Sequence, residues 1–291
     1  MSTLTLLSLS RLVGGGKNPK LFTTQKSSTK LSHNFDVTDA VEQIVMYLPQ
    51  ANRGRVLFDK YMTPKLWDQW RDRGARHRNV CPHSTKGCRA TCLGFSGHLA
   101  MAHTERAMLA RYLMLCMYPY QFWQLVHHEI GVHKQRVERH GKKLVVRING
   151  TSDLRVESEP REYGVDLLGD YPDVWFQDYT KRPLVASGWR TTVPNYYLVR
   201  SATERDGQDV FDEHDGNLVV PVDLPKDAPL PETFMGRPVV DGDKHDLRCL
   251  DHQISGANQH AVLVRVKKRK DGKRNVNDHG FIRPVTETVS V

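Results

Sequence analysis

The sequence predicts an α/β protein built around parallel strands. Two segments before residue 140 repeat apolar residues at helical spacing, and short runs rich in Val, Ile and Tyr follow them. Such runs are typical of buried parallel strands, which need crossover connections between them. The length of 291 residues allows one large α/β barrel or two ordinary domains.

Composition narrows the class of protein. The apolar content of 39% supports a real core, and the absence of any run of about 18 apolar residues predicts that nothing spans a membrane. The first eleven residues lack the basic leader and cleavage site of a secretory signal. Five unevenly placed cysteines do not form the framework of a disulfide-rich secreted protein, so we expect a reducing cytoplasm.

The N-terminal part carries few periodic signals. We expect residues 1–50 to form an irregular segment with one short helix at 39–48, and residues 51–291 to form a barrel-like domain. Residues 55–58 are expected to form a strand. The triple glycine at 14–16 lacks the preceding strand and the following Lys-Ser/Thr of a phosphate-binding loop, so it carries no nucleotide role.

The later elements are better marked. Apolar residues recur at helical spacing over 99–117, where Pro119 ends the helix, and again over 122–137, where Gly141 is placed to cap it. The strands that we expect afterwards lie at 144–148, 174–176, 196–199, 218–222, 239–240 and 261–266.

Three of the five cysteines fall within twelve residues. Cys81, Cys88 and Cys92 lie on a loop at 79–97 that contains Gly and Pro, so it can fold back and direct all three sulfurs to one soft metal centre. This C-x6-C-x3-C spacing predicts an iron–sulfur or zinc site. The alternatives are a disulfide pair with one spare thiol, and three unconnected cysteines.

Polar, turn-forming residues follow the carboxyl ends of four predicted strands. In α/β barrels the loops at this edge converge over the barrel mouth and carry the functional site. We therefore expect one shared pocket that binds a cofactor or an unknown small ligand through seven side chains: Asn149, Asp153, Asp178, Lys181, Glu204, Asp241 and Asp243.

Positive charge is concentrated late in the chain. The protein has 42 Lys and Arg against 33 Asp and Glu, a net charge of +9, and the densest basic stretch at 265–274 surrounds the turn dipeptide Asp271-Gly272. We expect a β-hairpin with a basic tip, which is either a solvated turn or a weak, salt-sensitive contact for nucleic acid without sequence preference.

Four ordered motifs carry a family resemblance. They are the cysteine loop ending Cys-Leu-Gly, Arg-Ile-Asn-Gly-Thr-Ser-Asp from Arg147, Phe-x-Asp-Tyr-Thr-Lys from Phe176, and Val-Val-Asp-Gly-Asp-x-x-Asp-x-Arg from Val239. Over residues 79–285 the chain resembles the bacteriophage gene product 88 family. The resemblance implies a TIM-barrel-like fold, an iron–sulfur site at the clustered cysteines, and a phage-encoded protein in the cytoplasm of the infected host cell. It implies no particular reaction.

The fourth ligand of such a cluster is left open by the sequence. Three cysteines leave one iron of a four-iron cluster to Cys116, Cys249, a carboxylate, a histidine or an open position. The family pattern has Phe or Trp where Cys249 stands, so Cys249 is an added ligand or, as we favour, a small core residue.

Two further chemistries are weighed against this interpretation. Radical S-adenosylmethionine enzymes use an open iron on a barrel, but their loop is C-x3-C-x2-C, and here Phe95 stands where that third cysteine would fall. Their Gly-Gly-Glu-type segment after the next strand is also missing. Zinc, completed by His83 or His98, is the alternative cofactor, although four-ligand zinc sites more often come as two close pairs.

Two classes of function therefore remain. The first is an iron–sulfur protein, with a four-iron cluster and redox or cluster-assisted chemistry on a small ligand at the barrel mouth. The second is a non-catalytic binding protein that contacts nucleic acid or a host protein. In that protein, zinc or a cluster would only hold the cysteine loop in its folded conformation.

Overall fold

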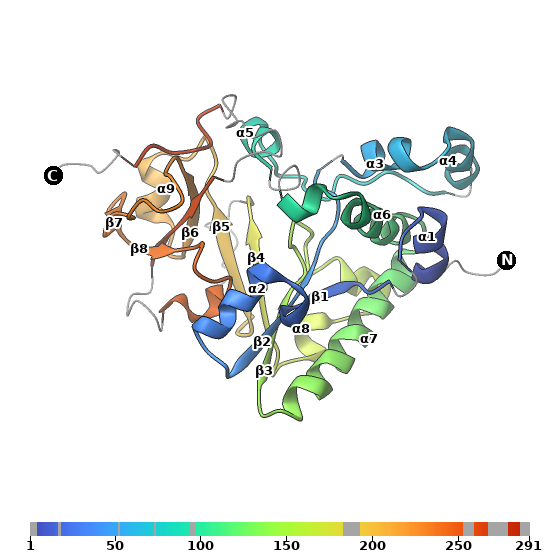
Figure 1. Ribbon diagram of the computed structural model, residues 1–291, viewed down its shortest axis with the longest axis horizontal. Helices are drawn as coiled ribbons and strands as arrows, with labels where there is room; N and C mark the ends of the chain where they lie inside the picture. The colour runs from blue at the N-terminus through green and yellow to red at the C-terminus, as the bar shows by residue number, and fades with distance from the viewer. Residues whose placement is uncertain are drawn as a thin grey trace.

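A mostly parallel sheet of nine strands organises the molecule, with the long helices α6 and α7 packed along one part of it (Figure 1). The computed structural model describes residues 5–16, 19–51, 53–72, 74–92, 97–182, 193–252, 259–266 and 279–285. The strands are β1 (Phe22–Thr24), β2 (Val41–Met46), β3 (Lys143–Arg147), β4 (Trp175–Thr180), β5 (Tyr196–Ser201), β6 (Leu218–Val222), β7 (Thr233–Phe234), β8 (Arg237–Asp241) and β9 (Ala261–Arg265). Their order is β1-β2-β3-β4-β5-β6-β9-β8-β7, and only the edge strands β1 and β7 are antiparallel to their neighbours.

The two long helices confirm the prediction from apolar spacing. The described α-helices are α1 (Leu6–Leu12), α2 (Thr29–Ser32), α3 (Arg53–Tyr61), α4 (Pro64–Arg71), α5 (Lys86–Ala90), α6 (Ala102–Met117), α7 (Pro119–Glu138), α8 (Leu167–Asp170) and α9 (Gln208–Glu213). Pro119 occupies the first turn of α7, where its missing N–H is not needed. Gly141 follows α7 with a φ of +68°, the left-handed conformation that ends many helices.

All six strands predicted beyond residue 140 are present, and each pairs in parallel with at least one neighbour. Their two faces bury different clusters. In β3, Val146 joins the large cluster under α6 and α7, whereas Val145 faces the opposite side. In β6, Val220 and Val219 divide in the same way. Burial on both faces explains why these strands are continuous apolar runs rather than alternating ones.

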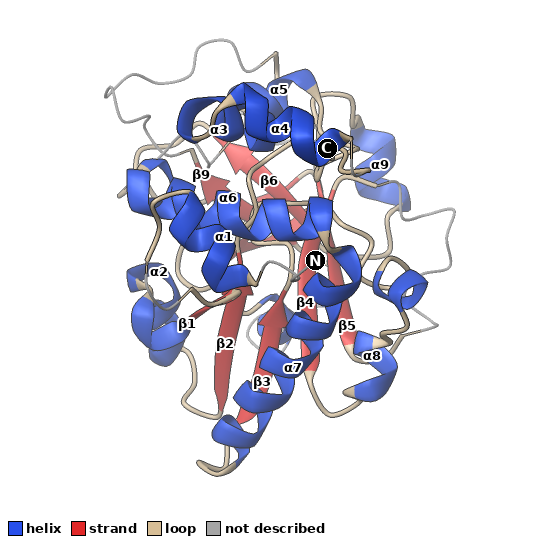
Figure 2. Cartoon of the chain, turned by 90° about the vertical axis from the view of Figure 1, so that its right-hand side faces the viewer, coloured by secondary structure: helices blue, strands red, loops and turns tan. Residues whose placement is uncertain are grey.

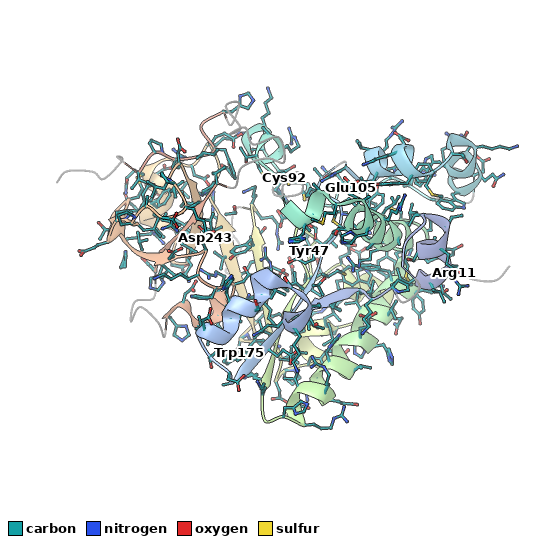
Figure 3. The ribbon with its side chains drawn as sticks, viewed as in Figure 1. Arg11, Tyr47, Cys92, Glu105, Trp175 and Asp243 are labelled. Atoms are coloured by element: carbon teal, nitrogen blue, oxygen red, sulfur yellow. The ribbon has the colours of Figure 1, made fainter. Side chains whose placement is uncertain are left out.

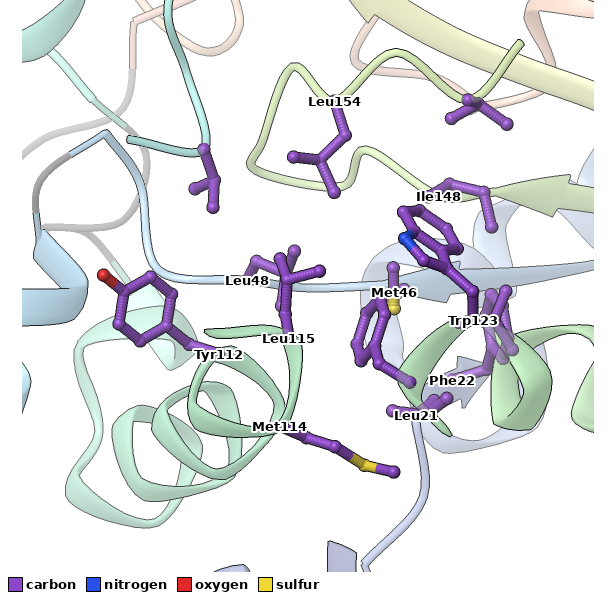
Figure 4. Close-up of a cluster of buried hydrophobic side chains, with 14 of the residues drawn as sticks. Leu21, Phe22, Met46, Leu48, Tyr112, Met114, Leu115, Trp123, Ile148 and Leu154 are labelled. Atoms are coloured by element: carbon purple, nitrogen blue, oxygen red, sulfur yellow. The ribbon is translucent and has the colours of Figure 1, made fainter. Parts of the chain in front are cut away.

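The largest core lies between α6, α7 and the first strands (Figure 4). Met46 from β2, Leu115 from α6, Trp123 from α7 and Ile148 after β3 are all fully buried there. Full burial of large apolar side chains contributes about 1.5–3 kcal/mol each. This cluster therefore fixes the helices against the sheet.

Two local predictions are wrong. Residues 39–48 do not form a helix, because 41–46 form β2, and all six side chains of β2 are buried. The buried carboxylate of Glu42 pairs with Arg136 of α7, and the buried amide of Gln43 bonds to Asp246, so both polar side chains of this strand have long-range partners. Residues 55–58 are not a strand but lie within α3.

The expected irregular segment at 1–50 takes part in the fold. Its described residues contribute α1, β1, α2 and β2, and β2 pairs in parallel with β3 in the same sheet as the later strands. Leu9 of α1 is fully buried in the same core as Met46 and Trp123.

The expectation of a closed, TIM-like barrel is wrong. Among the described residues, β1 and β7 form opposite edges of an open sheet, and β9 lies between β6 and β8, which breaks the sequential order of a barrel. Residues 242–252, the described part that follows β8, instead lie on the face opposite α6 and α7. Leu247 and Cys249 of this segment pack against Val41 and Val145, so it occupies space that a closed barrel would enclose.

None of the described helices combines the length and apolar character needed to cross a bilayer.

Candidate functional site

A cavity of about 250 Å³ lies at the carboxyl edge of the parallel strands. Figures 1 and 2 show α5 above this edge of the sheet. The cavity is lined by Cys81, Cys88 and Cys92 on one side and by the ends of β3, β4, β5, β6 and β9 on the other. Figure 3 labels two of its lining residues, Cys92 and Asp243, which are far apart in the sequence. The fold therefore brings the cysteine loop and the strand ends to one place.

Four of the seven predicted strand-end residues line this cavity. They are Asn149 after β3, Asp153 in the loop that follows, Lys181 after β4, and Asp243 after β8. The other three, Asp178, Glu204 and Asp241, lie beside the cavity and hold its walls. A ligand-binding role for any of the seven stays a prediction.

Asp178 lies behind the cavity wall and fixes Asn149. It is 3% exposed and accepts hydrogen bonds from the Asn149 backbone N–H at 2.6 Å and from the Tyr196 hydroxyl at 3.0 Å. Burial raises the pKa of Asp178 to about 7, although these hydrogen bonds oppose the shift. Asn149 in turn bonds to the loop at Ser152 and Leu154, so Asp178 shapes the cavity through Asn149.

Glu204 connects the end of β5 to α5, the helix that carries Cys88. Its carboxylate accepts hydrogen bonds from the Thr85 hydroxyl and from the Gly87 backbone N–H, the latter at 3.0 Å. Thr85 also caps α5 by accepting from the Cys88 N–H at 3.2 Å. Burial opposes ionisation of Glu204, but these hydrogen bonds lower its pKa overall. Glu204 is therefore a positioning residue for Cys88.

Asp241 and Asp243 neutralise Arg265 at the far wall. Arg265 Nη1 lies 3.1 Å from Asp241 Oδ1 and 3.4 Å from Asp243 Oδ2. Arg265 is the first residue of the predicted basic hairpin, and the remaining part, from 267 to 278, lies outside the described residues. Within the described part of that segment, Arg265 is therefore already neutralised by two aspartates.

Cys81, Cys88 and Cys92 are each partly buried. Burial raises the pKa of Cys81 to about 12 and also raises the pKa of Cys88, and the nearby thiols of Cys88 and Cys92 add to the shift of Cys81. Cys81 Sγ donates to the Thr151 carbonyl at 3.4 Å. Within the described ranges, no group of three or more His, Cys, Asp or Glu residues is arranged to hold a metal ion.

All three cysteines line the cavity, and thiolate sulfur is the kind of ligand that soft metals bind. Neither of the other cysteines lines the cavity. Cys116 lies on α6 beside the Tyr112 hydroxyl, and burial raises its pKa to about 11. Cys249 is 1% exposed and packs with apolar residues, which accords with the core role favoured for it.

Arg147, an arginine at the floor of the cavity, was not among the predicted site residues. Arg147, the last residue of β3, lines the cavity, and its Nη1 lies 2.9 and 2.8 Å from the two carboxylate oxygens of Asp246. Its guanidinium stands 4.3 Å from the ring centroid of Tyr179. It also donates to the carbonyls of Asn149 and Gly150 at 3.3 and 3.4 Å. Arg147 and Asp246 both fall within the motifs of the family resemblance, which was the only signal for them.

Gly150 allows the loop after β3 to approach β2 closely. A Cβ at this position would lie 2.6 Å from the Met46 carbonyl oxygen and 2.7 Å from the Tyr47 ring. Backbone oxygen cannot yield as a flexible side chain can, so only glycine fits. The close approach keeps Thr151 and Ser152 in the cavity wall.

Fold and site together define an α/β protein with an open, mostly parallel sheet and a cysteine-lined cavity at its carboxyl edge. The chain belongs to the gene product 88 family, whose model matches residues 27–282. No curated protein and no solved structure matches the chain.

Proposed function

We propose that this protein binds an iron–sulfur cluster through Cys81, Cys88 and Cys92, and that a small ligand occupies the cavity beside the cluster. The observation that carries the proposal is that all three cysteines line the same cavity as the strand ends. Three cysteines that line one cavity would provide three of the four ligands that a four-iron cluster uses. The open position would then face the cavity, where a ligand can reach it.

An iron–sulfur cluster is favoured over zinc because neither histidine proposed as a fourth zinc ligand lines the cavity. A structural zinc site needs four protein ligands. Of the candidates for a fourth ligand, neither His83 nor His98 is among the residues that line the cavity, and Cys249 is packed in an apolar cluster. A four-iron cluster does not need a fourth protein ligand at every iron, so three cysteines suffice.

When bound, the cluster would supply one-electron redox chemistry or an iron that accepts a ligand. The chain's own residues would position the reactants. Glu204 holds the helix that carries Cys88. Arg147 donates hydrogen bonds to the carbonyls of Asn149 and Gly150, and Val264 and Phe281 contribute apolar surface to the cavity lining.

We also propose, from the family, that the protein is phage-encoded and made in the infected host cell. The second candidate, a zinc- or cluster-stapled binding protein that contacts nucleic acid or a host protein, has less support. Its main feature is the basic segment, and the described part of that segment, Arg265, is already paired with Asp241 and Asp243.

Metal analysis of anaerobically purified protein separates these candidates. The proposal expects iron and labile sulfide in nearly equal amounts, a brown colour, and loss of iron on changing Cys88 to Ala. Changing Cys116 to Ala is the matched control, because Cys116 lies outside the cavity lining, and it should leave the iron content unchanged. Bound zinc without sulfide would overturn the proposal in favour of the second candidate.

A further inference from the structure

Two hydrogen-bond donors meet in the cavity wall, at the ends of β4 and β5. Lys181 Nζ donates to Ser201 Oγ at 2.6 Å, and both residues line the cavity. The ammonium group also lies 3.5 Å from the Ala202 carbonyl oxygen and 4.6 Å from the ring centroid of Phe281. All of these groups are uncharged, so within the described ranges no carboxylate pairs with the ammonium group of Lys181.

Lys181 differs in this respect from the other cations of the lining. Arg147 and Arg265 each pair with an aspartate. An ammonium group has three N–H donors, and two oxygen acceptors lie within reach of Lys181 Nζ, so one donor remains for a ligand. Lys181 is half-buried, and partial desolvation of an ammonium group is unfavourable unless an anion compensates it. The arrangement therefore favours an anionic ligand.

The carboxylates of the lining limit the charge of that anion. Asp153 accepts hydrogen bonds from the Thr180 hydroxyl at 2.7 Å and from the backbone N–H of Lys181 at 3.2 Å, so it holds the chain at the end of β4. Asp243, the second carboxylate of the lining, lies beside Arg265. A ligand with two negative charges would meet both carboxylates, with one ammonium group to compensate it. A single negative charge is therefore favoured.

Apolar side chains continue the wall from these two donors. Val219 is the strand partner of Ser201, and Pro221 is the partner of Val264, so the lining runs from β5 across β6 to β9. Phe281 adds its ring beside the ammonium group. An apolar cavity of about 150 Å³ can hold benzene. The cavity of about 250 Å³ thus has room for a ring with one charged group.

Resting on the part of the proposed function that puts a small ligand in this cavity, we infer that the ligand is a monocarboxylate with a compact apolar body. Its carboxylate accepts hydrogen bonds from Lys181 Nζ and from the Ser201 hydroxyl, and its apolar part lies against Val264 and Phe281. No metal takes part in this recognition, so it holds whether or not the cysteines carry a cluster. A phosphate ester would bring a second negative charge toward the two carboxylates of the lining.

Titration of the protein with benzoate, followed by ligand-detected NMR, tests this inference, because benzoate joins one carboxylate to one ring. Benzoate should bind saturably, and benzyl alcohol, benzylamine and phenyl phosphate should each bind roughly 10-fold more weakly or less. Lys181→Met should weaken benzoate binding by roughly 10- to 100-fold, the effect of losing a hydrogen bond between charged groups, and Lys181→Arg should restore part of it. Ser201→Ala should weaken it by roughly 2- to 10-fold, the effect of one hydrogen bond from a neutral group.

Benzyl alcohol also reports whether the cavity survives each substitution. It carries no charge, so Lys181→Met should bind it as the parent does. A parallel loss of both probes would overturn the inference, because Lys181 would then support the wall and not the ligand. Lys226→Met, which removes an exposed lysine, should bind benzoate as the parent does. Binding of phenyl phosphate or benzylamine as tight as that of benzoate would assign the site to a dianion or a cation and overturn the inference.

Iron and sulfide are measured on the same samples, so the two claims fail separately. Protein that contains the cluster but binds no benzoate, or binds it equally well as Lys181→Met, overturns the inference and leaves the cluster standing. Protein without iron and sulfide that binds benzoate through Lys181 overturns the cluster and supports the inference.

Discussion

Changing Asp246 to Asn removes the charge that neutralises Arg147 at the floor of the cavity. Both side chains are buried, at 2% exposed for Asp246 and 7% for Arg147. The substitution leaves the main-chain carbonyl of Asp246 in place, so its hydrogen bonds from Gln43 and Gln177 remain. The Asn variant therefore isolates the loss of charge from the loss of the segment's other contacts.

Removing one partner of a buried ion pair costs about 3–5 kcal/mol, because the remaining charge stays buried without compensation. We expect Asp246→Asn to lower the free energy of unfolding by about that amount. Urea unfolding of the metal-free protein, followed by tryptophan fluorescence, measures it. The double variant Arg147→Met, Asp246→Leu should recover much of the loss, since it leaves no buried charge.

An exposed ion pair provides the matched control. Asp68 and Arg71 lie 3.0 Å apart on α4 with both side chains more than half exposed. Asp68→Asn should lower the free energy of unfolding by less than about 1 kcal/mol. If Asp246→Asn unfolds with no greater loss than this control, the Arg147–Asp246 pair does not anchor the cavity floor as argued.

Three other changes give separate tests. Because burial raises the pKa of Asp178 to about 7, the folded protein keeps a proton that the unfolded chain releases above its ordinary pKa of 3.8. This group's contribution to stability therefore falls as pH rises from about 4 to about 7 and is constant above that range. Urea unfolding of Asp178→Asn should show a shallower fall than the parent, by up to about 1.4 kcal/mol per pH unit between pH 4 and 7, and equal slopes would contradict the assignment. Gly150→Ala should destabilise the protein by about 1–3 kcal/mol through its clash with backbone, whereas Gly16→Ala, with no atom within 4 Å of the added Cβ, should not; thermal unfolding compares them. Changing the basic residues at 267–270 to Ser should reduce retention on DNA at low salt, and equal retention would leave that segment as solvated charge.

The sequence was most informative where a residue's neighbours in the chain decide its structure. The helix ends at Pro119 and Gly141 and the strand Leu218–Val222 follow from local steric and apolar patterns. Strand β2 was missed because its Glu42 and Gln43 are satisfied by partners on α7 and after β8, which no local pattern contains.

The site residues likewise include some that local sequence predicts and others that only long-range contacts bring together. The cysteine loop and the polar strand ends are local signals, and the parallel sheet brings them together at its carboxyl edge. Arg147 and Asp246 are 99 positions apart, so their pairing depends on the path of the segment between β8 and β9. Leu247 and Cys249, in the described part of that segment, pack on the sheet face, and the described strands form an open sheet where a closed barrel was expected.

Iron and labile sulfide per chain, measured together with the electron paramagnetic resonance spectrum of anaerobically purified, dithionite-reduced protein, test the central claim most directly. A four-iron cluster on Cys81, Cys88 and Cys92 predicts about four iron and four sulfide per chain, and a signal from the reduced cluster that is lost when any one of the three cysteines is changed to Ala. Protein that holds neither iron nor sulfide, or that keeps both in all three Cys→Ala variants, would contradict the claim.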